Sequence, residues 1–394
     1  MDPQKDFSPP DFCMNDIRAA VPPHLFARST RRSLLYLVRD LAMVVSFGYF
    51  ATWIDSEALS CHLSAIGVSG DEILALRCAL WLAYWWFQGL AFTGVWVIGH
   101  ECGHGAFSSS SLVCNTVGFI THTVLWTPYF SWRISHRRHH QNHASMEKDE
   151  VYVPKTRSDL GLPPLAEEGS IKYEEILGDT PVYTLFMLVR QQLLAFPAYL
   201  LFNVSGQKHY PRWSNSVLFT KGQHNAVMAS NAGMLAMLFA VRFVSTIWGI
   251  TNVIKYYGIP WLCVTHWFIM ITYLHHTSPE IPHYRASAWT FQRGAAATVD
   301  RNFLGWQGRF FLHDVAHFHV VHHFFPKAPY NGEEATTYLQ KAIGSHYLYS
   351  DKPSFRALWR SYNDCQFVED DGDILFYRDR RGNFIRQAVA PTES

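Results

Sequence analysis

Long apolar runs alternate with polar stretches along this chain. Four runs of suitable length cover residues 34–54, 73–98, 225–250 and 253–274. A helix that crosses the hydrocarbon core of a bilayer needs about 20 mostly apolar residues. Tryptophan and tyrosine are frequent near the ends of these runs, as they are at membrane–water interfaces. The pattern therefore favours four membrane-spanning helices over the buried core helices of a soluble enzyme.

Two further apolar runs, 111–132 and 182–204, are interrupted by polar residues. The first contains Asn115, His122 and Pro128, and the second has an Arg-Gln-Gln sequence near its middle. Polar groups at such positions are costly in hydrocarbon unless they find partners. We expect both runs to be interfacial or re-entrant helices that do not cross the bilayer.

The remaining regions, 133–180 and 276–394, are polar and hold most of the charge. We predict an all-α fold, namely a multi-pass membrane helical bundle with a cytosolic helical cap. Arginines just before the first run favour a cytosolic N-terminus. The predicted division is a cytosolic segment at 1–32, a membrane domain with its cap at 33–380, and a C-terminal tail at 381–394.

The composition of the 394 residues adds one anomaly. The formal net charge is only +1, so nothing indicates a nucleic-acid partner. The seven cysteines are scattered without a C-x-x-C pair, which argues against a disulfide framework or a zinc ribbon. Histidine is the unusual residue in this composition, because the chain has 21 histidines and they are strongly clustered.

The clustered histidines have the spacing of metal ligands on helices. Residues three and four apart share one face of a helix, so each cluster points its imidazoles in one direction. The three clusters are His100 and His104; His136, His139 and His140; and His319, His322 and His323.

Eight imidazoles are too many for one ion, because zinc usually takes four ligands and a catalytic zinc only three from the protein. Two ions would share them, and imidazole suits iron, copper and zinc. Carboxylates near the clusters would then orient the ligands. Those close in sequence are Glu101, Asp149, Glu150 and Asp314.

Other functions also fit parts of this pattern. His100-Glu101-Cys-Gly-His104 has the H-E-x-x-H spacing of a zinc protease, with Glu101 as general base, but that function leaves six histidines unused. A metal carrier or a haem-binding membrane protein is a second alternative. If all three clusters bind one centre, they share one side of the membrane, and the run 111–132 cannot cross it.

The clusters lie within longer motifs. These include "DIRAAVPPHLFARS" at 16–29, "HECGHGAFS", "SHRRHHQNHASMEKDEVYVP", "ITYLHHTSPEIPHY", "GAAATVDR" and "HVVHHFF". With them the chain resembles the membrane fatty-acid desaturase family over about residues 16–380, in particular its oleate (delta-12) desaturase branch of plants and fungi.

The resemblance implies a di-iron centre that uses O2 to insert a cis double bond at the delta-12 position of oleoyl chains in membrane lipid. It implies a multi-pass protein of the endoplasmic reticulum membrane, with both termini and all histidine clusters cytosolic. Electrons would come from NADH through cytochrome b5 reductase and a separate cytochrome b5, since the chain has no His-Pro-Gly-Gly motif. The resemblance is also compatible with a homodimer.

The resemblance also adds His276 to the metal ligands. Its neighbour His275 replaces a residue that is usually glutamine in this branch, and His313 matches a recurrent position with a structural or a catalytic role. Gly105, His317 and the segment after the third cluster depart from the branch pattern. These departures leave a hydroxylase, an acetylenase or an omega-3-type desaturase as alternatives.

Overall fold

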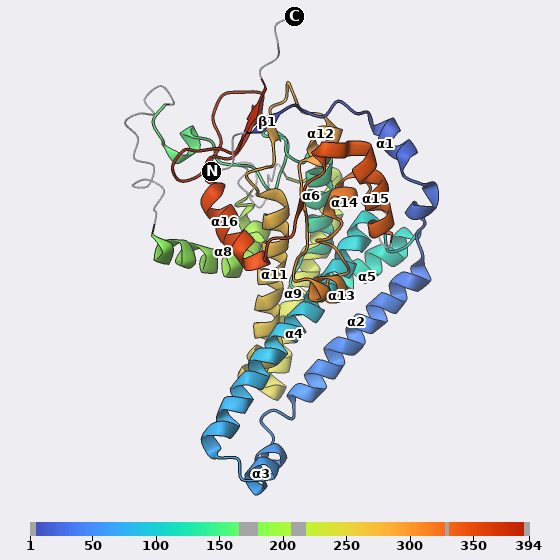
Figure 1. The fold of residues 1–394 in the computed structure, drawn as a ribbon. Coiled ribbons are helices and arrows are strands. Elements are labelled where there is room, and N and C mark those ends of the chain that lie inside the picture. Colours follow the sequence, from blue (N-terminus) through green and yellow to red (C-terminus); the bar gives the residue numbers. More distant parts are fainter. Residues whose placement is uncertain (1–4, 165–179, 206–217, 328–330, 390–394) are drawn as a thin grey trace, which may run out of the picture.

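The protein is described here by a computed structural model that covers residues 5–164, 180–205, 218–327 and 331–389. The described part is mostly helical, and its strands form only two-stranded sheets. Long helices run away from a cap of short helices and loops (Figure 1). The all-α fold class is therefore confirmed.

Five long helices carry most of the apolar sequence. Helix α4 packs against both α2 and α11, and α3 joins α2 to α4 at the end far from the cap (Figure 1). The bounds are α2 (Thr30–Ala51), α3 (Glu57–Ala65), α4 (Gly70–His104), α8 (Pro181–Phe202), α9 (His224–Trp248) and α11 (Ile259–His276).

Shorter elements build the cap and its connections. The helices are α1 (Met14–Ala20), α5 (Ser111–Thr123), α6 (Tyr129–Asn142), α10 (Ile250–Val253), α12 (Phe291–Ala296), α13 (Trp306–Phe311), α14 (His319–Phe324), α15 (Gly332–Ile343) and α16 (Ser354–Asp364). Single turns are η1 (Pro23–Phe26), η2 (Ser158–Leu160), η4 (Lys221–Gln223), η5 (Ile254–Gly258) and η6 (Gly344–His346).

Three short strand pairs tie distant parts of the cap together. Parallel pairing joins β1 (Lys5–Phe7) to β6 (Arg386–Ala388), and also β3 (Asp300–Arg301) to β4 (Tyr349–Ser350). Antiparallel pairing joins β2 (His283–Tyr284) to β5 (Ile374–Leu375). The first pair holds the two ends of the described chain side by side.

Helix α4 is longer than the apolar run that predicted it. It begins with a capping box, in which the Ser69 and Glu72 side chains each bond the other residue's backbone N–H. It ends at Gly105, whose φ of 69° is the left-handed conformation that glycine adopts without strain. The 35-residue helix therefore includes the first histidine cluster in its last turn.

Four helices are long and apolar enough to cross a membrane: Thr30–Ala51, Gly70–His104, Pro181–Phe202 and Lys221–Trp248. Large apolar side chains on their outer faces are exposed, as lipid-facing side chains are. The length and composition of these helices indicate a membrane protein.

Three of these helices match predicted spans, and the fourth does not. The run 182–204, which we expected to be interfacial, forms α8 and has the length and composition of a span. Figure 1 nevertheless shows α8 lying crosswise to α11, beside α16 in the cap. The fourth predicted span, 253–274, consists of η5 and α11 and is not among the four.

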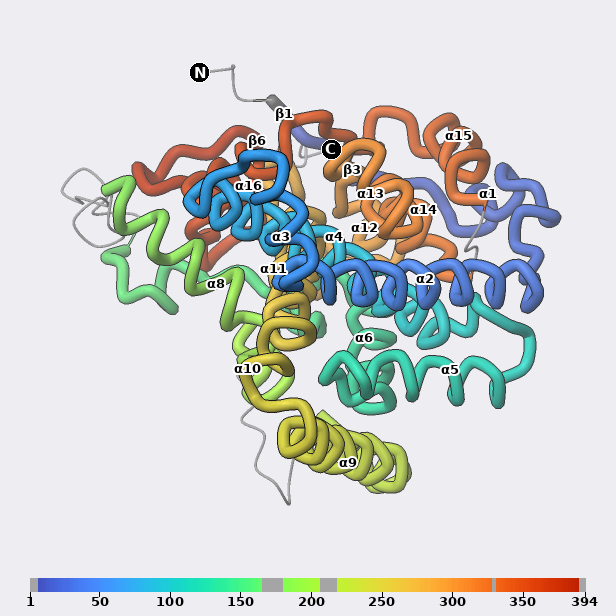
Figure 2. The backbone as a smooth tube through the Cα atoms, turned by 90° about the horizontal axis from the view of Figure 1, so that it is seen from below, coloured from blue at the N-terminus to red at the C-terminus, as the bar shows by residue number. Residues whose placement is uncertain are grey.

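The run 111–132 is broken into α5 and the start of α6. The 13 residues of α5 are too few to cross the bilayer, and Trp126 between the two helices has a positive φ of 57°. This break agrees with the expectation that the run does not cross. Figure 2 shows α5 and α6 together on the α2 side of the bundle, with α8 on the opposite side of α11.

Helices α4 and α5 approach each other closely at Gly99, one residue before the first cluster. A β-carbon at this position would lie 2.1 Å from Cδ2 of His122. We expect Gly99→Ala to lower the stability of the protein by roughly 1–3 kcal/mol, because the two helices must move apart.

Thermal unfolding followed by fluorescence measures this effect. The matched control is Gly48→Ala in α2, where an added β-carbon meets nothing within 4 Å. The control exchanges glycine for a better helix former and should leave stability equal or slightly higher. Equal melting temperatures for both variants would contradict the close contact at Gly99.

Candidate metal centre

The three predicted clusters converge at one place in the cap. Helix α4 contributes His100 and His104, whose Nε2 atoms are 3.2 Å apart. Helix α6 adds His136, with Nε2 3.0 Å from that of His104, and His140, with Nε2 3.2 Å from that of His136. His322 of α14 completes what we call the first imidazole group: His100, His104, His136, His140 and His322.

A second imidazole group lies beside the first. His276 at the end of α11 has its Nε2 3.4 Å from that of His139 and 3.2 Å from that of His319. His323 Nε2 lies 3.2 Å from His319 Nε2. His276 belongs to two overlapping triads, one with His139 and His143 and one with His319 and His323. We call these two triads together the second imidazole group: His139, His143, His276, His319 and His323.

All nine predicted ligands, His276 included, are therefore brought together in space. The two groups are adjacent, because the ring of His140 stacks on that of His323 with centroids 4.3 Å apart. Two neighbouring groups of imidazoles match the expectation of two neighbouring ions better than that of one.

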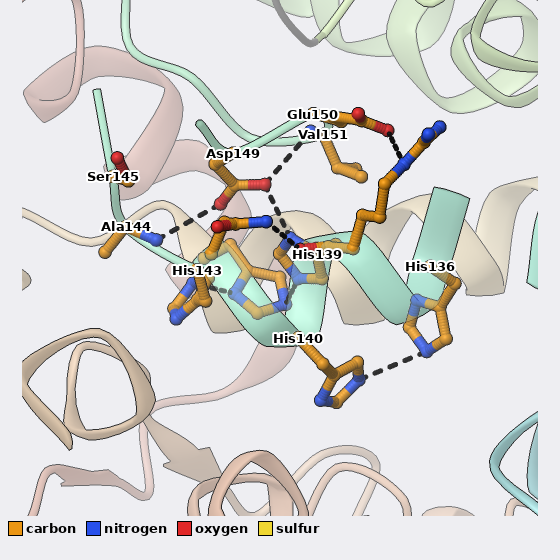
Figure 3. A network of polar contacts seen from close by, with 12 residues as sticks. His136, His139, His140, His143, Ala144, Ser145, Asp149, Glu150 and Val151 are labelled. Atoms are coloured by element: carbon orange, nitrogen blue, oxygen red, sulfur yellow. Dashed lines mark hydrogen bonds and ion pairs between the residues drawn. The ribbon is translucent and has the colours of Figure 1, made fainter. Parts of the chain in front are cut away.

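Two of the four nearby carboxylates orient imidazoles of the centre. Asp149 Oδ1 lies 2.8 Å from Nδ1 of His139, and Glu101 Oε1 lies 2.9 Å from Nδ1 of His100 (Figure 3 shows the former). A carboxylate accepts the Nδ1 proton, so Nε2 of each ring keeps its lone pair facing the group. This is the arrangement in which a carboxylate fixes the tautomer of a metal-binding histidine.

Asp149 is held firmly in this role. Burial alone would raise its pKa, but the imidazole of His139 and the backbone N–H of Val151 outweigh burial and hold the pKa below its usual value. Its other oxygen accepts the backbone N–H of Ala144 at 3.1 Å (Figure 3). The charged form therefore persists next to His139.

The other two carboxylates have different partners. Glu150 pairs with Arg138 at 2.9 Å, and Asp314 pairs with Arg309 at 3.0 Å. Only half of the carboxylates chosen by proximity in the sequence therefore orient imidazoles of the centre, because proximity does not determine which way a loop side chain points.

The donor set fits transition-metal ions. Burial and neighbouring imidazoles lower the pKa of His140 and His323 well below the usual value, so both rings are neutral and able to bind metal. Among the residues that the structure describes, buried Nε2 of His322 has no hydrogen-bond partner. Such an orphaned nitrogen within a group of five imidazoles is explained by a bound cation.

Sequence reasoning missed His143. It follows α6 directly, four residues after His139, and its side chain is 3 % exposed. The i, i+4 spacing from His139 would have identified it, had the second cluster been extended by one turn.

The other unusual histidines lie around the centre. His275 stacks on His319 with centroids 4.1 Å apart, and its Nδ1 donates to the carbonyl of Val299 at 2.5 Å. His313 Nε2 lies 2.6 Å from the buried carboxylate of Asp40, which favours a structural role for it. Neither ring belongs to the two imidazole groups.

Two cavities reach the centre from different sides. The first, of about 270 Å³, has mostly apolar walls and reaches five imidazoles. Its lining includes Trp96, Ala195, Phe268 and Ile269. The second, of about 670 Å³, has several arginines in its wall and reaches Glu101 and His322. An apolar ligand would therefore meet the imidazoles through the first cavity.

A buried carboxylate also supports α14. Asp300 accepts the backbone N–H of Val320 at 2.7 Å and the hydroxyl of Tyr347 at 2.5 Å. Burial raises its pKa to about 7, against the opposing effect of these two hydrogen bonds. Since the pKa in the fold exceeds that of the unfolded chain, the contribution of Asp300 to the free energy of unfolding decreases as pH rises from about 4 to about 7.

We expect Asp300→Asn to remove this dependence, since an amide does not titrate. Between about pH 5 and about pH 8, the melting temperature of the wild type should fall by a few degrees more than that of the variant. Calorimetry at both pH values measures the difference. Parallel pH profiles for the two proteins would show that Asp300 does not titrate in this range.

Comparison with known proteins agrees with this geometry. Residues 79–350 match the family model described as "Fatty acid desaturase". The chain belongs to the fatty acid desaturase family. A second model, of a domain of unknown function, matches residues 2–49.

Curated relatives cover nearly the whole chain of this desaturase. It is 42% identical over 389 residues to a delta-12 fatty acid desaturase of Mortierella isabellina, covering 95% of this chain and 92% of the relative. An oleate hydroxylase of Claviceps purpurea is 36% identical, with 95% and 82% covered. A fatty acid conjugase of Calendula officinalis is 37% identical, with 92% of each chain covered.

Proposed function

We propose that this desaturase inserts a cis double bond at the delta-12 position of oleoyl chains in membrane lipid. The observation that carries the proposal is the 42% identity over 389 residues with a delta-12 fatty acid desaturase. The apolar cavity that ends at the imidazole groups supports it, because an acyl chain is the kind of ligand that such a cavity accepts.

The imidazole groups are proposed to hold two iron ions. The ligands would be the nine predicted histidines: His100, His104, His136, His139, His140, His276, His319, His322 and His323. Two irons with O2 supply the strong oxidant that hydrogen removal from an unactivated methylene requires. Asp149 and Glu101 accept from Nδ1 of His139 and His100, so Nε2 of each ring would be free to bind an ion.

The remaining task of the chain is to place one C–C unit of the substrate beside the ions. Trp96 and Phe268 pack on each other with ring centroids 4.4 Å apart, and both line the apolar cavity. Rigid aromatic walls restrict the conformations of an acyl chain and exclude water from the site. The position of attack is then determined by how far the chain enters the cavity.

The proposed location is the endoplasmic reticulum membrane, with both termini and the centre in the cytosol. If α2, α4, α9 and α11 cross the bilayer, then α8 cannot, because a fifth crossing would separate the third histidine cluster from the second. The crosswise position of α8 supports this topology (Figure 1). We propose NADH, through cytochrome b5 reductase and a separate cytochrome b5, as the electron source.

A divergent product is the main alternative. The hydroxylase and conjugase relatives are 36% and 37% identical, only a few per cent below the desaturases. The zinc protease alternative is weaker, because His100 and His104 share their group with three further imidazoles. Family membership likewise argues against a simple metal carrier.

Expression in yeast, with profiling of the fatty acids by mass spectrometry, tests the proposal. New linoleate, absent from cells with an empty vector, is the expected result. A hydroxylated or acetylenic fatty acid would assign the chain to a divergent activity. An unchanged profile with iron-loaded protein in the membrane would overturn the proposal.

A further inference from the structure

We propose that His143 is a positioning residue of the metal centre, which fixes the tautomer and the orientation of His276 through a direct hydrogen bond. The inference rests on the proposed di-iron function and adds to it a tenth histidine, which acts through a ligand and does not bind the metal. It concerns the second imidazole group, where α6, α11 and α12 meet.

The proton positions follow from one fixed acceptor. The carbonyl oxygen of Gly294 can only accept, and it lies 2.8 Å from Nδ1 of His143. Nδ1 of His143 therefore carries the proton, and Nε2 of the neutral ring carries a lone pair. This Nε2 lies 2.8 Å from Nδ1 of His276, so it accepts the proton of His276 Nδ1.

The same chain of bonds determines the metal-binding atom of His276. With Nδ1 of His276 protonated, its Nε2 has a free lone pair, and this atom lies 3.4 Å and 3.2 Å from Nε2 of His139 and of His319. His143 therefore fixes the tautomer of His276 as Asp149 fixes that of His139. The acceptor is a neutral imidazole in the first case and a carboxylate in the second.

A direct metal-binding role for His143 fits the geometry less well. Its ring lies near those of His276 and His323, with centroids 4.6 Å and 4.5 Å away, so a ligand role must be considered. However, Nε2 has a single lone pair in the ring plane. It cannot both accept a hydrogen bond at 2.8 Å from His276 and bind an ion.

The surroundings hold His143 in place. Its own carbonyl oxygen accepts Nε1–H of Trp289 at 3.0 Å. A β-carbon on Gly294 would lie 2.3 Å from that carbonyl oxygen, so only glycine permits this approach of α12. These contacts hold the segment after α6 against α12. The hydrogen bond from His276 to His143 then ties the position of the His276 ring to that of this segment.

The test compares His143→Ala and His143→Gln in purified full-length protein loaded with ⁵⁷Fe. The readouts are iron per chain and the Mössbauer spectrum, alongside turnover. Alanine removes the acceptor, and we expect it to weaken iron retention about 10–100-fold and to change the signal of one iron. Glutamine can donate to Gly294 and accept from His276, so we expect it to restore much of both readouts.

His283→Gln is the matched control, because His283 is also a buried histidine of the cap, 2 % exposed, and belongs to neither imidazole group. It should leave iron content and spectrum unchanged. Wild-type iron content and spectrum in His143→Ala would overturn the positioning role. So would loss of one imidazole from the iron shell in X-ray absorption of His143→Gln, because this variant keeps an acceptor for His276 and the loss would identify His143 itself as a ligand. Wild-type protein that takes up no iron would instead overturn the di-iron function itself.

Discussion

Replacement of His139 with Ala should abolish new linoleate in yeast, a decrease of at least about 100-fold. His139 is the imidazole with the strongest support in the structure, because Asp149 orients it and its Nε2 faces His276. Loss of an orienting partner alone typically costs 10–100-fold, and loss of the ligand removes more. Its removal also leaves the buried carboxylate of Asp149 without its imidazole partner.

The measurement is the ratio of linoleate to oleate, normalised to the amount of desaturase in the membrane fraction. His283→Ala serves as the control, since it removes a buried ring outside both imidazole groups. Turnover by the His139 variant at the wild-type level, with equal protein, would exclude His139 from the centre.

Filling the apolar cavity should have the second largest effect. Ala195 on α8 lines this cavity of about 270 Å³, and an indole side chain there would occupy much of the space. We expect Ala195→Trp to reduce conversion of oleoyl chains at least about tenfold. The indole would fill space that the acyl chain needs, and the surrounding side chains could make room only by adopting strained conformations.

Leu194→Trp is the matched control for this variant. Leu194 is the neighbouring residue on the same helix, but its side chain is 58% exposed and does not line the cavity. It should retain near-normal conversion. Equal activity of the two variants would show that the acyl chain takes another route, and the larger cavity near Glu101 would then be the one to block.

Hydropathy and helical spacing predicted the parts of this fold that depend on local sequence. Three long apolar helices were found in this way, as were eight of the nine histidines proposed as ligands. The ninth, His276, came from the family resemblance. The spacing of three and four residues succeeded because α4, α6 and α14 are regular helices through each cluster.

The remaining features depend on tertiary contacts. The role of α8 is ambiguous from composition, since a crosswise helix against a cap and a spanning helix can have the same apolar content. His143 lies just beyond the end of α6, and its partners Gly294 and His276 are more than a hundred residues away. The i, i+4 spacing from His139 marks His143 itself, but no local pattern identifies these two partners.

The unbroken course of α4 has a consequence for how this centre can vary. At about 1.5 Å per residue, its 35 residues span roughly 50 Å, which exceeds a hydrocarbon thickness of about 30 Å. Inserting one residue before His100 would rotate that imidazole by about 100° about the helix axis and turn it away from its partners. Insertions within α4 are therefore tolerated only near whole numbers of turns, and the loops beyond the helix must absorb any other change in length.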